Sequence, residues 1–500
     1  MAIFIRQKKT FCALITYIAV LLSHPIFCQD TGEKDSLKPN IIFILVDDFG
    51  WNQVGCYGSK IVRTPNLDNL AREGAKFTSA YAMPQCSPTR AAFLSGKYPA
   101  RSGMTKVINN RFFGSAPMLT PKVRKKLPPE WYSLAKMLKS SGYTTGISGK
   151  WHVADNYPLA PIKEKKGMAY FNAYGFDWAG DASEGKAKND KAVMDITHEI
   201  LGFIDQNKAN PFFAYVSHFT THSPLAAPDT LVEKYVKEGY TRMTDKWGII
   251  PERPTADFLA MTEHLDYSIG LIVEKLEKLG LTENTLIAVM GDNGALGRFW
   301  DHTPLRESKG SLYEGGIRVP LIMKWPKAIK PGIEVETPVH IIDLYPTFME
   351  IAGGRGKQGY KNDGVSLTPL IFNKGTFNRE VLYFHHPHYV PMYGKTPGSI
   401  VRKGDYKLIY YFGDYLNTEG LEAEHRKLYG KLELGEKIEL FNVKEDIGEK
   451  KDLSAAMPEK VNEMMSLLRD WWEETEAALP VKNPDYNPND PFAETVNKER

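Results

Sequence analysis

One short segment combines a thiol, a helix-start signal and an arginine. It reads Cys86-Ser-Pro88-Thr-Arg90, and residues 91–94 can continue a helix that Pro88 favours. Cys86 would then lie at a helix N-terminus, where free backbone N–H groups and the helix dipole favour an anion. Arg90, one turn further on, could direct a planar cation to the same place. Taken alone, the segment predicts an oxyanion-binding nucleophile, a phosphatase-like thiolate or a capped structural turn.

Four other segments share one pattern, in which an apolar, strand-forming run ends abruptly in polar residues. The runs are residues 40–46, 144–148, 211–216 and 286–290. The polar residues that follow them are Asp47 and Asp48, Lys150 and His152, His218 and His222, and Asp292 and Asn293. Runs that are apolar on both faces suit a parallel sheet covered by helices, and ligands bind beyond the carboxyl ends of such strands. We therefore expect these polar residues to converge.

Two of these clusters are rich in oxygen ligands. Asp47 and Asp48 are adjacent carboxylates, and two negative charges at one strand end point to a bound cation. Asp292 and Asn293 offer a second pair. Because no soft ligand is among them, they favour a hard cation, Ca²⁺ or Mg²⁺. The alternatives are a solvated loop or helix cap for the first pair and a plain Asp-Asn-Gly turn for the second.

The segments between the strands have helical periodicity. The clearest helix covers residues 255–279 and ends at Gly280; its apolar face is formed by Leu265, Ile269, Ile272 and Leu276. Strands that alternate with helices predict an α/β fold, here a large, mostly parallel mixed sheet sandwiched by helices. We assign residues 38–384 to this catalytic domain.

The pattern changes after Phe384. Residues 406–412 and 437–442 are typical of antiparallel strands, and residues 458–477 of an amphipathic helix. We expect a smaller α+β subdomain with a short antiparallel sheet over residues 385–480, followed by an irregular tail over 481–500.

Composition and the N-terminus indicate the compartment. The 500 residues carry a formal net charge of only +3, which gives no overall field that attracts nucleic acid. Arg6, Lys8 and Lys9 precede an apolar run, residues 11–22, that is too short to span a bilayer comfortably. Residues 1–28 therefore read as a signal peptide, and we expect a secreted or periplasmic protein without a transmembrane segment.

Two of the four cysteines, Cys12 and Cys28, fall in or at the edge of this leader. Soluble export is favoured because Phe27 is bulky where lipoprotein cleavage sites carry a small residue; lipid anchoring at Cys28 is the alternative. Only Cys56 and Cys86 remain with certainty, so the chain is not a disulfide scaffold.

The segment from Cys86 to Arg90, with Leu94-Ser95-Gly96 behind it, resembles the signature of the sulfatase family. A second stretch, Lys309 to Pro320, resembles that family's Lys-Gly-x-x-x-Glu-Gly-Gly-x-Arg-Val-Pro segment. The resemblance runs from about Pro39 to about Leu453. It implies a formylglycine-dependent, arylsulfatase-like type I sulfatase of the alkaline phosphatase superfamily, with an alkaline phosphatase-like fold.

The resemblance also implies the roles of the site residues. Cys86 would be oxidised to Cα-formylglycine by a formylglycine-generating or sulfatase-maturing enzyme. The formylglycine would hold one Ca²⁺ together with Asp47, Asp48, Asp292 and Asn293. Lys150 and Lys309 would contact the sulfate. His222 would be the general acid, His152 the base that helps to collapse the sulfated hydrate, and Arg90 a brace for the hydrate.

The hydrated aldehyde explains why a cysteine precursor is needed. One hydroxyl attacks sulfur, and the second then expels sulfate, whereas a serine would leave a stable sulfoenzyme. Cys86 should therefore not form a disulfide, which leaves Cys56 as a packed free thiol.

The substrate is expected to be a sulfated oligosaccharide or polysaccharide, attacked by exo action. Four side chains are candidates for contacting it: His302, Arg306, His386 and His388. For the histidines of segment 385–388, the alternative is a surface loop at the domain junction. The rival functions are a phosphonate monoester or phosphodiester hydrolase of the same superfamily, and a non-catalytic sulfated-glycan binder in which Cys86 is not converted. The sequence does not indicate the oligomeric state, nor a role for His218.

Overall fold

The structure is a computed structural model of the chain. It describes residues 38–108, 111–154, 162–182, 189–243, 253–391, 395–417, 431–492 and 495–496. The predicted signal peptide, residues 1–28, lies outside these ranges. None of the helices within them combines the length and the apolar character needed to cross a bilayer.

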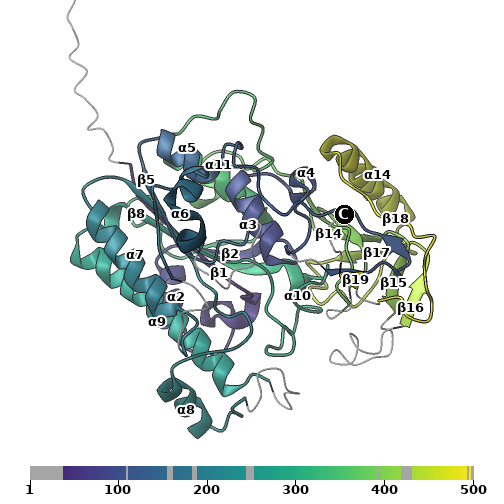
Figure 1. Cartoon of the computed structure of the whole chain (residues 1–500), viewed down its shortest axis with the longest axis horizontal. Coiled ribbons are helices and arrows are strands. Elements are labelled where there is room, and N and C mark those ends of the chain that lie inside the picture. The colour runs from purple at the N-terminus through teal and green to yellow at the C-terminus, as the bar shows by residue number, and fades with distance from the viewer. Residues whose placement is uncertain are drawn as a thin grey trace, which may run out of the picture. The chain divides into compact units, whose positions relative to one another are not determined.

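A large mixed sheet forms the centre of the described chain (Figure 1). Its strand order is β10-β2-β9-β8-β1-β7-β5-β6, with β11 beside β2. The strands are β1 Asn40–Val46, β2 Ala75–Tyr81, β5 Thr144–Gly149, β6 Trp178–Ala179, β7 Phe212–Ser217, β8 Thr285–Gly291, β9 Arg318–Lys324, β10 Ile333–Val335 and β11 Val339–His340. Strands β8, β1, β7, β5 and β6 are parallel, and β9 is antiparallel to both neighbours. The predicted mostly parallel mixed sheet is confirmed.

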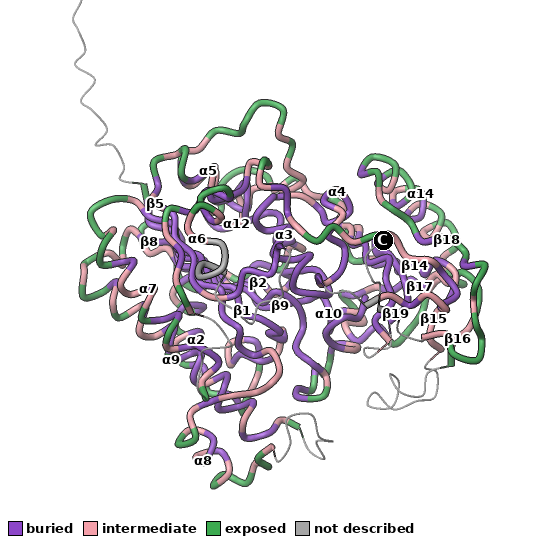
Figure 2. Tube along the Cα trace, in the orientation of Figure 1, coloured by how far each residue is buried: buried purple, intermediate pink, exposed green. Residues whose placement is uncertain are grey.

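Alternate side chains of β1 enter two different hydrophobic cores. Ile41, Phe43 and Leu45 pack on one face, with helices α3 (Cys86–Ser95), α5 (Leu134–Ser140) and α11 (Leu344–Ile351). Ile42, Ile44 and Val46 pack on the other, with α2 (Pro65–Arg72), α7 (Val193–Asn207) and α9 (Ala256–Lys278). This two-sided burial is why the strand is apolar at every position, and Figure 2 shows the buried centre between the helices.

Local signals set the ends of the helices that the sequence predicted. Thr255 caps α9, because its hydroxyl accepts a hydrogen bond from the Phe258 N–H, and Gly280 follows the helix with a φ of +66°. Helix α3 begins at Cys86, as predicted. The remaining short helices are η1 Trp51–Gln53, η2 Gly55–Tyr57, α4 Pro99–Ser102, α6 Ile162–Asn172, α8 Asp229–Lys237, η3 Thr282–Asn284, α10 Glu314–Ile317, η4 Ile341–Asp343 and α12 Thr368–Ile371.

A separate antiparallel sheet follows, in the order β12-β13-β14-β17. Its strands are β12 Val381–His386, β13 Gly398–Lys403, β14 Tyr406–Tyr411 and β17 Lys437–Asn442, and α14 (Pro458–Thr475) packs against it. The stacked rings of Trp471 and Tyr383, 4.8 Å apart, join helix and sheet. The predicted antiparallel sheet is confirmed. The boundary predicted after residue 384 falls inside β12, whose pairing with β13 begins at Val381.

The tail after residue 480 is not wholly irregular, which corrects the prediction. Strand β18 (Val481–Lys482) pairs with β4 (Met118–Leu119), and β19 (Thr495–Val496) pairs with β3 (Arg111–Phe112). The polar, proline-rich composition hid these strands because two-residue pairings depend on main-chain groups and need no apolar pattern. A further hairpin joins β15 (Asp414–Asn417) to β16 (Lys431–Leu434).

Candidate active site

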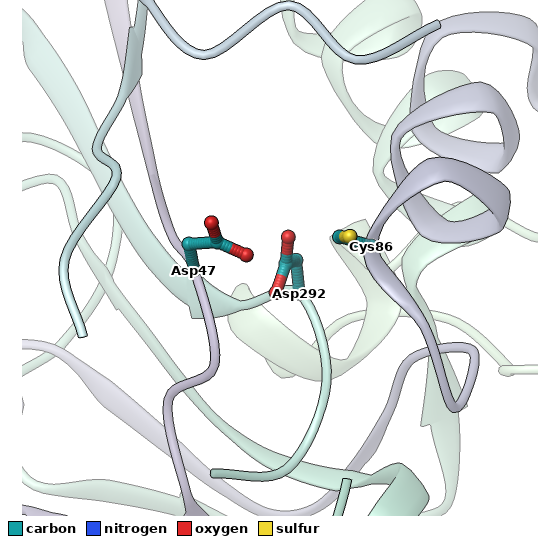
Figure 3. A group of neighbouring side chains, drawn as sticks. All are labelled: Asp47, Cys86 and Asp292. Atoms are coloured by element: carbon teal, nitrogen blue, oxygen red, sulfur yellow. The ribbon is translucent and has the colours of Figure 1, made fainter. Parts of the chain in front are cut away.

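The polar residues predicted to converge do so at the carboxyl ends of β1, β5, β7 and β8, except for His218, whose charged neighbours are His264 and Asp190. In the parallel register, Leu45 of β1 lies opposite both Ser217 of β7 and Met290 of β8, so Asp47 and Asp292 leave the sheet side by side. Cys86 approaches from the first turn of α3. Asp47, Cys86 and Asp292 each offer one ligand atom, and these three atoms lie within 4.8 Å of one another. Figure 3 shows the three side chains next to one another, with Asp292 between Asp47 and Cys86.

Each of the three carboxylates at this centre has a cationic partner. The Lys150 ammonium pairs with Asp47, and Lys309 Nζ lies 2.5 Å from Asp48 Oδ1. The Arg90 guanidinium donates to Asp292 Oδ2 from Nη2 at 2.7 Å and from Nε at 3.0 Å. All six side chains are 5% exposed or less. Charges this deeply buried are tolerated only when they are paired.

Three oxygen atoms at this centre nevertheless have no hydrogen-bond donor. They are Asp47 Oδ1, Asp48 Oδ2 and Asn293 Oδ1, all buried. The Asn293 amide is held in place because its Nδ2 donates to Asp48 Oδ1 at 2.8 Å and to the Gly294 carbonyl. Leaving such oxygens without donors costs free energy. A set of donor-free carboxylate and amide oxygens fits a hard divalent cation.

The surroundings set the protonation of these groups. Burial by itself would raise the pKa of Asp47, but Lys150, His222 and Arg90 hold it well below its ordinary value. Burial and the negative charge of Asp47 raise the pKa of Asp292 to about 7, against the lowering by Arg90. Two carboxylates this close resist being ionised together without an added cation.

The Cys86 side chain is poorly suited to act as a thiolate. Burial raises the pKa of its thiol to about 11, although Lys150 and Lys309 lower it. At neutral pH the unmodified thiol stays protonated, and a protonated thiol is a weak nucleophile. This disfavours the phosphatase-like alternative. Both Cys86 and Cys56 are free cysteines, as expected.

Two residues at this centre have left-handed backbone conformations that non-glycine residues rarely adopt. Asp48 has a φ of +58° and His152 a φ of +52°. The turn at Asp48 is held by Thr221, whose hydroxyl donates to the Asp48 carbonyl at 2.8 Å. Strained residues of this kind cluster where a side chain must be aimed at a ligand.

The two predicted acid–base histidines differ in exposure and in setting. His152 is 1% exposed, and burial together with Lys150 and Arg90 holds its pKa well below the usual value. The His222 side chain is 18% exposed; its Nδ1 lies 2.5 Å from the Ser223 carbonyl, and its Nε2 lies 3.9 Å from Asp48 Oδ2. Burial and Lys309 lower the pKa of His222 to about 4. The Nδ1 contact fixes the tautomer and leaves Nε2 as the atom facing the centre.

Sequence reasoning assigned no role to Ser217 or Gln85, which support this arrangement. Ser217 Oγ accepts from Arg90 Nη1 at 2.5 Å and donates to the Lys150 carbonyl at 2.6 Å, so it fixes the Arg90 guanidinium and the backbone of Lys150. Gln85 precedes Cys86, and its Oε1 accepts from the Val107 N–H. Both residues stand directly beside the motifs, and that adjacency was the available signal.

The four candidate substrate residues lie in different places. His302 is buried with Nε2 2.9 Å from the Ala295 carbonyl, and Arg306 donates to the Glu449 carbonyl and stacks on Tyr313. These contacts are internal, so the substrate roles of His302 and Arg306 stay predictions. His386 Nε2 lies 3.0 Å from Gln85 Oε1, and His388 Nε2 lies 2.7 Å from Thr105 Oγ1. The surface-loop alternative for segment 385–388 is wrong, because its three histidines are 2% exposed or less.

The sulfatase family model matches residues 39–354, which is more than half of the chain and includes the whole carboxylate centre. This chain belongs to the sulfatase family. A second model, described as N-sulphoglucosamine sulphohydrolase, C-terminal, matches residues 308–471. The protein is thus a sulfuric ester hydrolase of the sulfatase family, with the fold that the sequence predicted.

Similar proteins agree with this assignment. A "Sulfatase" of Formosa agariphila is 29% identical over 93% of this chain and 94% of its own length. The solved structure of Ps i-CgsB has a TM-score of 0.67 at 27% identity, covering 90% of this chain and 94% of that one; Ps i-CgsB has also been solved with k-i-k-neocarrahexaose. BT4656, solved with its substrate D-glucosamine-2-N,6-O-disulfate, has a TM-score of 0.65 over 88% of this chain and 98% of its own, and at 20% identity it shows the fold alone.

Proposed function

We propose that this sulfatase releases inorganic sulfate from a sulfated carbohydrate, using a formylglycine hydrate made from Cys86 and one Ca²⁺. The observation that carries the proposal is the set of three donor-free oxygens on Asp47, Asp48 and Asn293 beside a buried cysteine. Asp47, Asp48, Asp292, Asn293 and the modified Cys86 would hold the cation. When bound, the cation would polarise a sulfate oxygen and favour ionisation of the hydrate.

The chain's own residues then have separate tasks. Lys150 and Lys309 would each share their charge between a carboxylate and the non-bridging oxygens of the sulfate, in a site where burial strengthens electrostatic interactions. Arg90, fixed by Asp292 and Ser217, would hold the nucleophilic side chain in line. An aldehyde hydrate supplies an oxygen nucleophile and a second hydroxyl with which to release sulfate.

The two histidines are proposed for the proton transfers. His222 Nε2 faces the centre and would donate a proton to the leaving alcohol oxygen. Without substrate the pKa of His222 is about 4, so we expect the bound sulfate anion to raise it. His152, kept neutral by burial and by Lys150, can accept a proton from the hydrate when sulfate is expelled.

A carbohydrate substrate is supported by the solved relatives, whose bound molecules are a neocarrahexaose oligosaccharide and a disulfated glucosamine. We infer export from the signal pattern of residues 1–28, with a sulfatase-maturing enzyme as the partner that converts Cys86. Exo action on the saccharide end is part of the same proposal.

The test is a screen of matured protein against defined sulfated saccharides, with free sulfate as the readout and phosphodiester model esters alongside. We expect sulfate release and much slower diester hydrolysis; faster diester hydrolysis would overturn the sulfated-carbohydrate assignment. Peptide mass spectrometry across Cys86 should find the aldehyde in active protein. Active protein with an unmodified thiol would contradict the formylglycine, and inactive protein with one would favour a binder.

A further inference from the structure

Four basic side chains lie buried beside the start of α3, outside the carboxylate centre. They come from two segments far apart in the sequence and are each 6% exposed or less; we call them the basic cluster: Lys106, His386, His388 and Lys395. The charges act on one another, since Lys395 and Lys106 lower the pKa of His386, and Lys106 lowers that of Lys395, in each case after the effect of burial. Concentrating like charges in a buried place is unfavourable unless an anion joins them.

Gln85 connects this cluster to the nucleophile. Its Oε1 accepts a hydrogen bond from the Val107 N–H at 3.0 Å, which identifies that atom as the oxygen, because a backbone N–H can only donate. His386 Nε2, 3.0 Å from the same oxygen, must therefore be a donor. The backbone N–H of Ile108 also donates to Ser87 Oγ. The segments that carry the cluster thus contact the residues on both sides of Cys86.

Two polar atoms of the cluster have no hydrogen-bond partner among the described residues. They are Lys395 Nζ and His386 Nδ1, on side chains that are 4% and 0% exposed. A neighbouring histidine shows the contrast, because His385 places Nδ1 2.7 Å from Ser399 Oγ and Nε2 3.0 Å from the Ala478 carbonyl. Lys407, equally buried, pairs with Glu314 and Glu449. Lys407 thus has acceptors, whereas Lys395 Nζ has none among the described residues.

We propose that the basic cluster binds a second anionic group of the substrate, a sulfate or a carboxylate on the same or the adjoining sugar, while the scissile sulfate lies at Cys86. Lys395 Nζ would donate to that anion. His386 already directs its Nε2–H at Gln85, so its Nδ1 would donate only after the anion has favoured protonation of the ring, and Lys106 would add positive charge. The inference rests on the proposed function and specifies its substrate as a saccharide with at least two anions.

The basic cluster and the nucleophile Cys86 are buried to a similar extent. Cys86 is 2% exposed and Lys309 4%, so a substrate that reaches one reaches a place as enclosed as the other. An anion there would accept from Lys395 Nζ and would raise the lowered pKa values of Lys395 and His386, so that both could carry a proton toward it. A neutral sugar offers only hydroxyl groups and cannot neutralise this charge.

The test compares kcat/KM for matched disaccharides that carry the same scissile sulfate and either no further anion, a carboxylate or a second sulfate. Wild type should prefer a dianionic substrate by about 10- to 100-fold. Lys395→Met should reduce this ratio to near one, and Lys395→Arg should keep most of it. Comparing kcat/KM for the disaccharide with a carboxylate and the disaccharide with a second sulfate shows which anion the basic cluster prefers. Melting curves check that each variant is folded.

A matched control is Lys324→Met. Lys324 is 7% exposed and pairs with Glu73 at 2.6 Å, and its register opposite Ile287 puts it at the start of β8, away from Asp292. Lys324→Met should leave the ratio of kcat/KM between dianionic and monoanionic substrates unchanged. A folded Lys395→Met with the wild-type ratio, or a wild type without preference, overturns the inference.

Calorimetry with the desulfated product separates this inference from the proposed function. If no substrate releases sulfate, the product that keeps its second anion should still bind wild type at least about 10-fold more tightly than a neutral product and lose that advantage in Lys395→Met. Equal binding of both products would refute the subsite, whatever the activity.

Discussion

Two groups of buried charges in this chain differ in how completely they are paired. Between the large sheet and the C-terminal sheet, Glu314 accepts from Lys407 at one oxygen and from Tyr81 and Arg318 at the other. Glu449 lies 2.7 Å from Lys407 Nζ and accepts from the Glu314 N–H. At the carboxylate centre, Asp47 and Asp48 each keep one oxygen without a donor.

The difference separates a structural role from a ligand-binding one. In the Glu314–Lys407–Glu449 group, both oxygens of Glu314 accept hydrogen bonds, and Glu449 Oε1, which has no hydrogen-bond donor, still lies 2.7 Å from Lys407 Nζ. The donor-free oxygens of Asp47 and Asp48 instead lie 3.9 Å from Arg90 Nη2 and His222 Nε2, respectively, so they are the ones left for a further partner. At the carboxylate centre, the donor-free oxygens lower the stability of the folded state until an added cation binds them. Both groups are buried to the same degree, so burial alone would not have distinguished them.

Asp48→Asn is the substitution at the carboxylate centre for which we expect the largest loss of activity. The amide keeps one oxygen for Lys309 and replaces an oxygen that has no donor. Sulfate release should fall by about 1,000-fold, because a cation ligand and transition-state charge are lost. With a chelator present, loss of the buried pair with Lys309 is partly offset because repulsion among the three carboxylates is relieved, so the free energy of unfolding should fall by less than the loss of about 3–5 kcal/mol expected for a broken buried pair. Near-normal turnover would contradict the role of Asp48.

The same carboxylate-to-amide change in the structural group should act in the opposite way. Glu314→Gln breaks a fully buried ion pair with Lys407 and Arg318. We expect a loss of about 3–5 kcal/mol in the free energy of unfolding, measured by denaturant titration. The turnover of the folded fraction should stay within about twofold of wild type. A stable but inactive variant would show that the two groups are not separate in function.

Asp414 offers a third case and the smallest effect. Its Oδ1 accepts from Tyr389 at 2.6 Å, its Oδ2 has no partner, and burial raises its pKa to about 7. Because the folded pKa lies above the unfolded one, the folded state binds more protons, and stability falls as pH rises from about 4 to 7. Asp414→Asn should raise Tm by about 2 °C at pH 8 and not at pH 4. An equal shift at both pH values would refute this.

The sequence predicted the helices and strands that are determined by residues close together in the chain. Strand β1 is apolar at every position because both of its faces are covered, and α9 carries its cap and its stop in Thr255 and Gly280. The cluster of Asp47, Asp292 and Cys86 could be expected because parallel strands end at one edge. The family signature added the roles of the lysines and histidines.

Other features depend on contacts between distant segments. Lys395 and Lys106 have no motif, and they meet only because β12 brings His386 next to Gln85, some 300 positions earlier in the chain. The short strands at the end of the chain pair through main-chain groups that composition does not encode. Whether a buried carboxylate is fully paired is equally invisible in the sequence, since Lys309, which pairs with Asp48, and Lys407, which pairs with Glu314, come from distant parts of the chain.

The most direct test of the account is a calorimetric titration of Ca²⁺ into metal-free, matured wild type, with Glu314→Gln and Asp48→Asn titrated in parallel. The donor-free oxygens predict one bound Ca²⁺ per chain in wild type and in Glu314→Gln, and affinity weakened at least about 100-fold in Asp48→Asn. Equal affinity in wild type and Asp48→Asn, or no binding by wild type, would contradict the claim that these oxygens form a calcium site.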